Sequence, residues 1–201
     1  MTIRNSKVRW GALSQLLHWL IVLLIAAQVA LALTAKELPR GPMVRTIVGY
    51  HKALGITILA LAVIRLAWRW MNPVPALPGT LKPYEKVLAR LTHGGLYVIL
   101  FAMPLSGWIA SSAHGFPVRW FNLFTVPALT GKDLPLSAAM NELHYALAIA
   151  LGVIVVLHIV AALKHHFVLK DDTLRRMLPG AQATASYEAA GGRAAKQSSR
   201  V

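Results

Sequence analysis

Two histidines, His144 and His158, lie in an otherwise apolar stretch near the C-terminal end of the sequence, ELHYALAIALGVIVVLHIVAALKHHF. An imidazole titrates near neutral pH, so its presence in hydrocarbon indicates a chemical task such as metal ligation or proton transfer. Fourteen residues separate the two histidines, which is just under four turns of an α-helix. Both rings therefore leave the same face of one helix, about 21 Å apart along its axis.

The elements that must position these rings are four long apolar segments. The chain has 201 residues, of which 56% are hydrophobic and 14% charged, a composition typical of membrane proteins. A membrane-spanning helix needs about 20 apolar residues. Four segments approach that length, at about 13–33, 51–70, 91–112 and 143–163. We expect an all-α fold, an integral membrane four-helix bundle within residues 13–170. A basic leader at 1–12 precedes it, and a tail at 171–201, disordered from about 180, follows it.

Charge and cysteine content narrow the functional classes. Most of the 21 Lys and Arg residues precede the first segment, separate the second from the third, or follow the fourth. The positive-inside rule therefore places both termini in the cytoplasm. These charges flank the spans and do not form one soluble basic face, so they do not indicate nucleic-acid binding. The absence of cysteine excludes disulfides, thiolate-held iron–sulfur clusters and c-type haem attachment.

A cleaved signal peptide is the alternative interpretation of the first segment, because basic residues precede it and Ala30-Leu31-Ala32 resembles a cleavage site. The apolar core of such a peptide is only about 7–15 residues long. This segment is longer and contains His18 and Gln28, so we expect it to be retained.

With this topology, four histidines fall into two pairs of equal depth. His18 and His158 each lie about one and a half turns from the cytoplasmic ends of their helices, while His51 and His144 lie at the outer ends. Two imidazoles facing across a bundle are what bis-histidine ligation of haem requires. Small residues near them would leave room for a macrocycle: Gly11, Ala12, Gly55 and Gly152. The alternative is that the histidines are buried and hydrogen-bonded to the backbone or to one another.

The sequence resembles the bacterial cytochrome b561 family over about residues 8–180. The resemblance rests on SQLLHWLIVLLI, VGYHKALGI, YVILFAMPLSGW and the ELHY…VLHIVAALKHHF stretch. It implies a dihaem membrane cytochrome in which His18 and His158 bind the inner haem b and His51 and His144 the outer one. The family moves electrons across the inner membrane and uses ubiquinone, and one type of member takes its electrons from periplasmic superoxide.

Other polar residues near the predicted spans have several interpretations. Lys52 and Arg65 could pair with haem propionates, although snorkelling is the default for Arg65. His93 could replace His18 as a ligand, contact a propionate or a quinone, or be solvated at the interface. For His165 and His166 we expect contact with water or headgroups. For His114, in the outer loop, we expect contact with water, and a position bordering the outer haem is the alternative.

Three functions remain open from the sequence. The first is electron transfer from superoxide, or another periplasmic donor, to ubiquinone, which would make the protein a superoxide:ubiquinone oxidoreductase. A net basic outer face would attract such an anion. The second is a membrane anchor and electron-wiring subunit for a periplasmic dehydrogenase or a soluble cytochrome, in which the outer loops form a docking surface. The third is a small transporter with a histidine proton relay.

Two connections carry specific structural expectations. The loop at about 113–140 is the longest on the outer side, and we expect it to form a cap with a short helix. The third helix is expected to begin before the membrane, within Lys82–Arg90.

Overall fold

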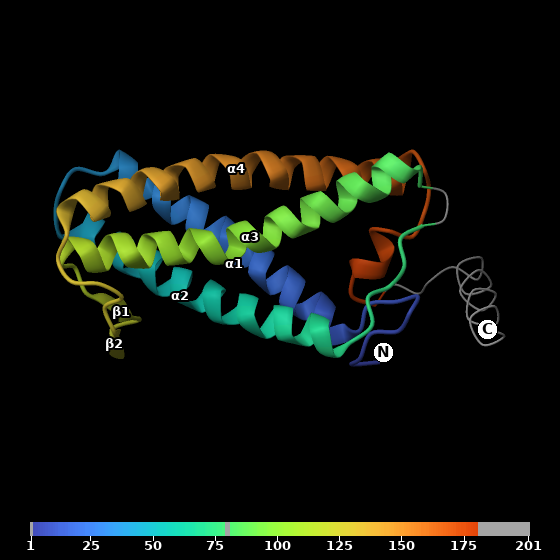
Figure 1. Ribbon diagram of the computed structural model, residues 1–201, viewed down its shortest axis with the longest axis horizontal. Coiled ribbons are helices and arrows are strands. Elements are labelled where there is room, and N and C mark those ends of the chain that lie inside the picture. The colour runs from blue at the N-terminus through green and yellow to red at the C-terminus, as the bar shows by residue number, and fades with distance from the viewer. Residues whose placement is uncertain (1, 79–80, 181–201) are drawn as a thin grey trace. The chain divides into compact units, whose positions relative to one another are not determined.

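The computed structural model of the chain describes residues 2–78 and 81–180 (Figure 1). Four long helices account for most of these residues: α1 (Ala12–Glu37), α2 (Pro42–Met71), α3 (Pro83–His114) and α4 (Leu134–Phe167). Each is long and apolar enough to cross a membrane. Each of the four predicted spans lies inside one of them, and α3 begins before its apolar part, as expected. The predicted disorder of the tail falls on residues 181–201, which lie outside the described residues.

The helices contribute to two compact units. One, here called the terminal unit, comprises Met1–Trp19, Arg65–Thr92 and Val155–Val201. The other, the hairpin unit, comprises Leu20–Ile64 and His93–Ile154. Each unit therefore takes a part of every long helix, and each contains one of the two histidine pairs predicted from the sequence.

In the terminal unit, the N-terminal leader is fixed to the start of α1 by Asn5. The Oδ1 atom of Asn5 accepts hydrogen bonds from the Gly11 backbone N–H, at 2.9 Å, and from the Ser14 hydroxyl, at 2.7 Å. Its Nδ2 donates to the Pro73 carbonyl, and the Trp68 indole donates to the Ser14 hydroxyl oxygen. The leader is thereby joined both to α1 and to the end of α2.

The segment after α4 folds back onto α1 in the same unit. It includes the 3-10 helix η1 (Arg175–Met177). The Gln15 side chain donates to the Arg176 carbonyl at 3.0 Å, and the Trp19 indole donates to the Met177 carbonyl at 2.8 Å. The buried Arg176 guanidinium donates to the Ala76 carbonyl at 3.0 Å. Residues 171–178 thus belong to the packed unit and are not a free extension.

In the hairpin unit, the long loop differs from our expectation. It forms no short helix but an antiparallel pair of strands, β1 (Val118–Trp120) and β2 (Phe124–Val126). The strands are β-branched and aromatic, and Pro117 and Pro127 flank them, which disfavours a helix here. The Trp120 indole donates to the Thr57 hydroxyl at 3.0 Å and so ties the hairpin to α2.

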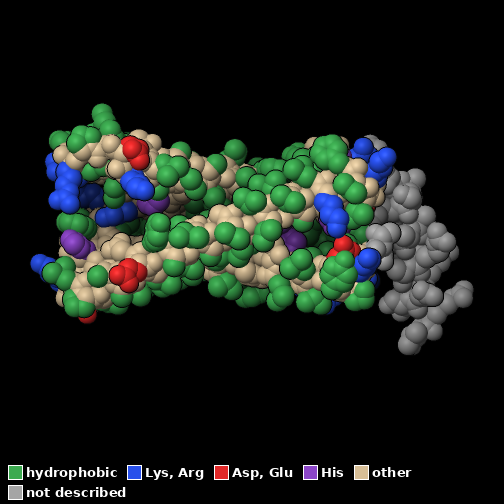
Figure 2. Space-filling model, turned by 90° about the horizontal axis from the view of Figure 1, so that it is seen from above, with side chains coloured by type: hydrophobic (Ala, Val, Ile, Leu, Met, Phe, Trp, Pro, Cys, Tyr) green, Lys and Arg blue, Asp and Glu red, His purple; other side chains and the backbone are tan. Residues whose placement is uncertain are grey.

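The surface of the helices is apolar. Hydrophobic side chains cover much of the helical surface on the face that Figure 2 shows. None of the most apolar part of α4 is buried within the chain. A soluble protein rarely exposes so much contiguous apolar area, so the four helices fit a multi-pass integral membrane protein.

Candidate haem-binding sites

The structure brings the four histidines together in two pairs, one in each unit. In the terminal unit, the ring centroids of His18 on α1 and His158 on α4 lie 6.4 Å apart, with an interplanar angle of 69°. In the hairpin unit, the rings of His51 on α2 and His144 on α4 lie 6.2 Å apart at 70°. These are the partners that the sequence predicted, and the two pairs have almost the same geometry.

The separation within each pair matches that of two ligands on one metal ion. A ligating imidazole nitrogen lies about 2 Å from the metal and about 1.1 Å from its own ring centroid, so two opposed ligands place their centroids about 6.2 Å apart. A direct linear hydrogen bond between two imidazoles would place them only about 5 Å apart. The observed 6.2 and 6.4 Å therefore favour ligation over the alternative of histidines bonded to each other.

The donor set fits haem and not a bare metal ion. Among residues 2–78 and 81–180, no group of three or more His, Cys, Asp or Glu side chains could hold a metal. Each pair supplies two ligands, so the other positions around an octahedral iron would come from a planar macrocycle. The residues present thus fit a porphyrin with one imidazole on each side.

The hairpin unit fixes the tautomer of His144. Its Nδ1 lies 2.9 Å from the Met103 carbonyl oxygen of α3 and 3.0 Å from the Ser106 hydroxyl, which itself donates to the same carbonyl at 2.8 Å. A carbonyl only accepts, so Nδ1 carries the proton and Nε2 keeps its lone pair for a metal. Such a hydrogen bond is the usual support of a metal-ligating histidine.

Gly107 leaves the space that the His144 ring occupies. A Cβ atom at Gly107 would lie 3.1 Å from Cε1 and 3.2 Å from Nδ1 of that ring. The sequence analysis did not identify Ser106 as a partner of His144. The one sequence signal for Ser106 is a hydroxyl in an apolar span, where polar groups need a partner.

The other proposed space-making glycines have different surroundings. A Cβ atom on Gly11 would meet the backbone of Ile3 and Arg4, so the leader fills that space and our expectation of room for a macrocycle at Gly11 is wrong. A Cβ atom on Gly152 would have no neighbouring atom within 4 Å outside its own stretch of helix. Gly55 faces the Gln28 side chain, whose Nε2 would lie 3.3 Å from an added Cβ.

The remaining candidate residues lie near or apart from the pairs. Lys52 follows His51 on α2, is partly buried, and donates to the Ser111 hydroxyl at 2.7 Å beneath the Phe116 ring. Arg65 is half-buried in the terminal unit. The His158 ring is paired with the His18 ring. His93 is exposed on α3.

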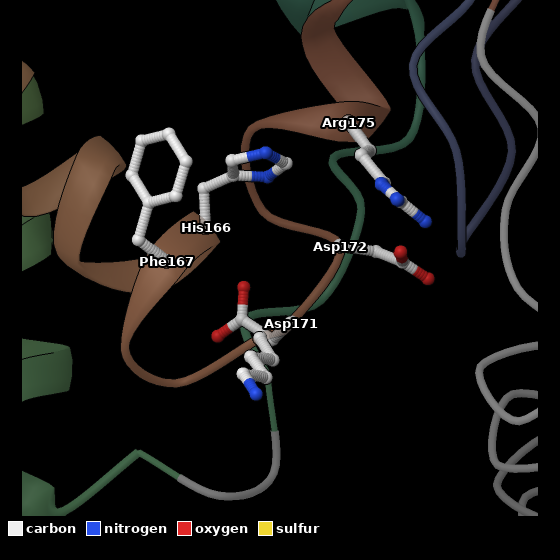
Figure 3. A pocket seen from close by; sticks show the side chains of 6 residues that line it. His166, Phe167, Asp171, Asp172 and Arg175 are labelled. Carbon is white, nitrogen blue, oxygen red and sulfur yellow. The ribbon is translucent and has the colours of Figure 1, made fainter.

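The last two histidines of α4, His165 and His166, lie at a pocket of the terminal unit. A cavity of about 330 Å³ is lined by His166, Phe167, Lys170, Asp171, Asp172 and Arg175, as the close view shows (Figure 3). Beside it, Nδ1 of His165 pairs with the Asp171 carboxylate. His165 therefore has a partner in the protein, which corrects our expectation of contact with water or headgroups alone.

His114 lies in the hairpin unit, where it is exposed and stacks on Phe116 with ring centroids 4.4 Å apart.

The stability of the segment after α4 depends on pH through the Asp171 carboxylate. Burial by itself would raise its pKa, but hydrogen bonds from Thr173 and His165 outweigh burial and hold the pKa below its ordinary value of 3.8. A carboxylate with a lowered folded pKa contributes stability above its unfolded pKa and loses it as the pH falls through the folded pKa.

We therefore expect Asp171→Asn to lower the stability of the detergent-solubilised protein at pH 6, by less than about 1 kcal/mol because the pair is partly solvated. The difference from the native protein should shrink and vanish as the pH falls below 3.8. Thermal melts of both proteins between pH 3 and pH 6 measure this. A difference that stayed constant across the range would contradict the role of the Asp171 carboxylate.

Comparison with known proteins identifies the family. A family model described as prokaryotic cytochrome b561 matches residues 9–180. The chain is 36% identical over 185 residues to cytochrome b561 homolog 2 of Escherichia coli K12, covering 89% of this chain and 95% of that protein. It is also 31% identical over 169 residues to the probable superoxide oxidase CybB of Yersinia pestis, covering 81% of this chain and 92% of that protein. The chain belongs to the prokaryotic cytochrome b561 family, whose members carry b-type haem and transfer electrons in membranes.

Gly107→Ala provides a test of the His144 site. Alanine normally stabilises a helix relative to glycine by about 0.5–1 kcal/mol, but here the added methyl must displace the His144 ring. We expect haem to bind the hairpin unit about tenfold more weakly, the size of effect that disturbing the support of a metal ligand produces. Haem titration of the apoprotein measures this. Gly49→Ala, an exposed position in α2 where an added Cβ would have no neighbouring atom within 4 Å, is the matched control and should bind haem normally.

Proposed function

We propose that this protein is a dihaem b-type cytochrome of the bacterial inner membrane that passes electrons from periplasmic superoxide to ubiquinone near the cytoplasmic face. The observation that carries the proposal is the pair of nearly identical histidine sites, with ring centroids 6.4 and 6.2 Å apart. His18 and His158 are assigned to the inner haem, and His51 and His144 to the outer one. Two sites, one in each unit, support a count of two haems per chain.

When bound, the haems supply reversible one-electron chemistry. The chain's own contribution is to hold each iron between two imidazoles, to exclude water and to set the potential. At the outer site, Met103 and Ser106 orient His144, and the Lys52 ammonium places a positive charge one residue from His51. In the terminal unit, Arg65 is the candidate partner for a propionate. His93, at the start of the α3 part of the hairpin unit, is a candidate contact for a propionate or the quinone.

The proposed overall reaction balances in electrons and protons. Two superoxide anions are each oxidised to dioxygen, giving one electron apiece. One ubiquinone takes both electrons, together with two protons, and becomes ubiquinol. Oxidation of superoxide itself needs no proton, so the outer site requires attraction of an anion and not an acid.

The charge of the hairpin unit supports superoxide as the donor. With the termini in the cytoplasm, the loops and helix ends of this unit face the periplasm, and their charged residues are Lys36, Arg40, Arg45, Arg119 and Lys132 against Glu37, Asp133 and Glu142. Lys52 adds one more positive charge at the start of the second predicted span. A net positive mouth raises the encounter rate of an anion. The relative from Yersinia pestis, named as a probable superoxide oxidase, supports the same donor.

The test is reduction of the purified, oxidised haems by enzymatically generated superoxide. We expect reduction faster than spontaneous dismutation consumes the anion, and a rate that falls as salt screens the attraction. Adding superoxide dismutase should abolish the reduction. The double variant Arg40→Gln, Arg45→Gln should slow it at low salt and make it less sensitive to salt. Reduction that superoxide dismutase does not suppress would rule out superoxide as the donor.

A second candidate function has its own observation. The hairpin region exposes large apolar side chains, among them Phe116, Leu123 and Phe124, at 57%, 73% and 56% of their surface. Exposed aromatic groups on a periplasmic loop would suit docking of a soluble dehydrogenase or cytochrome. Co-purification of a periplasmic redox protein, lost in Leu123→Ser, would favour this wiring role. Isolation without such a partner would favour direct reaction with superoxide.

A further inference from the structure

Gln28 is a polar residue within the apolar helix α1, in the hairpin unit. Its carboxamide oxygen Oε1 is buried and has no hydrogen-bond partner among the described residues. A buried acceptor without a donor is costly, and more so in a membrane span, where no water replaces the lost hydrogen bond. A residue of this kind in a span therefore indicates a role in the site it faces.

His51 presents the complementary atom. Its Nδ1 is likewise buried and, among the described residues, lacks a hydrogen bond of good geometry, although the Gln28 backbone carbonyl interacts with the ring. If Nε2 of His51 ligates a metal, Nδ1 carries a proton and must donate it. The hairpin unit thus holds a buried acceptor without a donor, the Gln28 Oε1 atom, and a buried imidazole nitrogen, the His51 Nδ1 atom, without a hydrogen bond of good geometry among the described residues.

The position of Gly55 indicates that the Gln28 carboxamide and the His51 imidazole are close to each other. Gly55 lies one helical turn after His51 on the same face of α2. A Cβ atom at this position would lie 3.3 Å from Nε2 of Gln28, so the carboxamide lies against α2 within one turn of the imidazole. The Gln28 backbone carbonyl therefore contacts His51, and the Gln28 side chain contacts α2 one turn further along, at Gly55.

We propose that Gln28 is the positioning residue of His51, whose Nδ1–H donates to the Gln28 carboxamide oxygen in the haem-bound protein. A rotation of the flexible glutamine side chain brings the two atoms together, and the missing side chain at Gly55 leaves the space for it. The contact is the counterpart of the Met103 carbonyl at His144. The inference rests on the proposed ligation of the outer haem by His51 and His144.

The hydrogen bond has a predictable electronic effect. An acceptor on Nδ1–H makes the opposite ring nitrogen more electron-rich, which stabilises ferric over ferrous iron and lowers the reduction potential. Loss of the acceptor should therefore raise the potential of the outer haem alone. If Gln28 had a purely structural role, replacing it would weaken haem binding, and any change in the reduction potential of the outer haem would have no predicted sign.

The experiment is a spectroscopic redox titration of the haem-loaded protein and three variants. Gln28→Met keeps the size of the side chain but removes the acceptor. At the applied potential that half-reduces the native outer haem, the Gln28→Met variant should increase the ratio of reduced to oxidised outer haem by roughly three- to tenfold. This is the effect of one neutral hydrogen bond on an equilibrium. Gln28→Glu keeps an acceptor oxygen in either protonation state, so the ratio should be native or lower. Thr34→Val, which removes a hydroxyl bonded only within α1, should change nothing.

Each outcome decides the point. An unchanged outer potential in Gln28→Met, or the same rise in Gln28→Glu, overturns the inference. If Gln28→Met loses the outer haem, its retention at native potential in Gln28→Glu supports the inference, and its loss in both variants overturns it. Native protein with a single haem would instead contradict the proposed function, so the two failures are distinguishable.

Discussion

Replacing His158 with alanine is expected to remove one haem from each chain and leave the other with its native spectrum. The His18 and His158 rings form a pair separate from that of His51 and His144, and each pair lies within its own compact unit. If His18 and His158 are the two ligands of one haem, as proposed, the variant would keep only one of them, which would weaken haem retention strongly. Haem content should therefore fall by about half, and His144→Ala should remove the other half.

The control for this prediction is another histidine substitution in the same chain. His114 is exposed, stacks on Phe116 and belongs to neither pair, so His114→Ala should retain the full haem content. The double variant His144→Ala, His158→Ala should be colourless. Equal loss of both haems in either single variant would argue against two separate sites.

Gly11→Ala is expected to destabilise the terminal unit by more than about 2 kcal/mol, since the site cannot relax without moving backbone. The added Cβ would lie 2.6 Å from the Arg4 carbonyl oxygen and would overlap the Ile3 backbone. That backbone leads into Asn5, which joins the leader to α1 and to Pro73. A thermal melt followed by haem absorbance measures the effect, and the inner haem should be released first.

Gly49→Ala is the matched control, because it lies in α2 with no neighbouring atom within 4 Å of an added Cβ. It should be neutral or mildly stabilising, as alanine in an open helical position usually is. A melting temperature in Gly11→Ala equal to that of Gly49→Ala would show that the leader does not pack against Gly11.

The histidine pairs could be predicted because helix geometry connects spacing with direction. A fourteen-residue separation fixes a common face for His144 and His158, and alternating spans fix which histidines share a depth. Four long apolar segments leave few arrangements open in a membrane. The element type therefore followed from the length of the apolar segments, and the pairing followed from helix geometry together with the alternating direction of the spans.

The groups that support the pairs could not be predicted in this way. The acceptor for His144 is the backbone carbonyl of Met103. Because every residue has such a carbonyl, this hydrogen bond cannot be predicted from residue types. Gln28 was noticed only as a polar residue unlike a signal peptide, since its neighbours on α2 depend on how the helices pack. The spacing of residues along one helix predicts which face of that helix is buried, but it does not predict how the helix is rotated against its neighbour.

The contacts of residues 171–178 were missed for a different reason. Arg176 binds the Ala76 carbonyl 100 positions away, and Gln15 binds the Arg176 carbonyl 161 positions away. Such pairings depend on the whole chain path, and a short polar segment after a span resembles any cytoplasmic extension. The β-hairpin was missed because strands of three residues give too short an alternation to recognise.

The most direct test of the central claim is a haem count on the detergent-purified protein. A pyridine haemochrome assay against protein concentration, with a reduced-minus-oxidised spectrum, gives the number and type of haems. The account predicts about two haems b per chain, both with the spectrum of bis-histidine, low-spin iron. One haem per chain would mean that one of the two histidine pairs serves another purpose, and none, with haem in ample supply, would contradict the account.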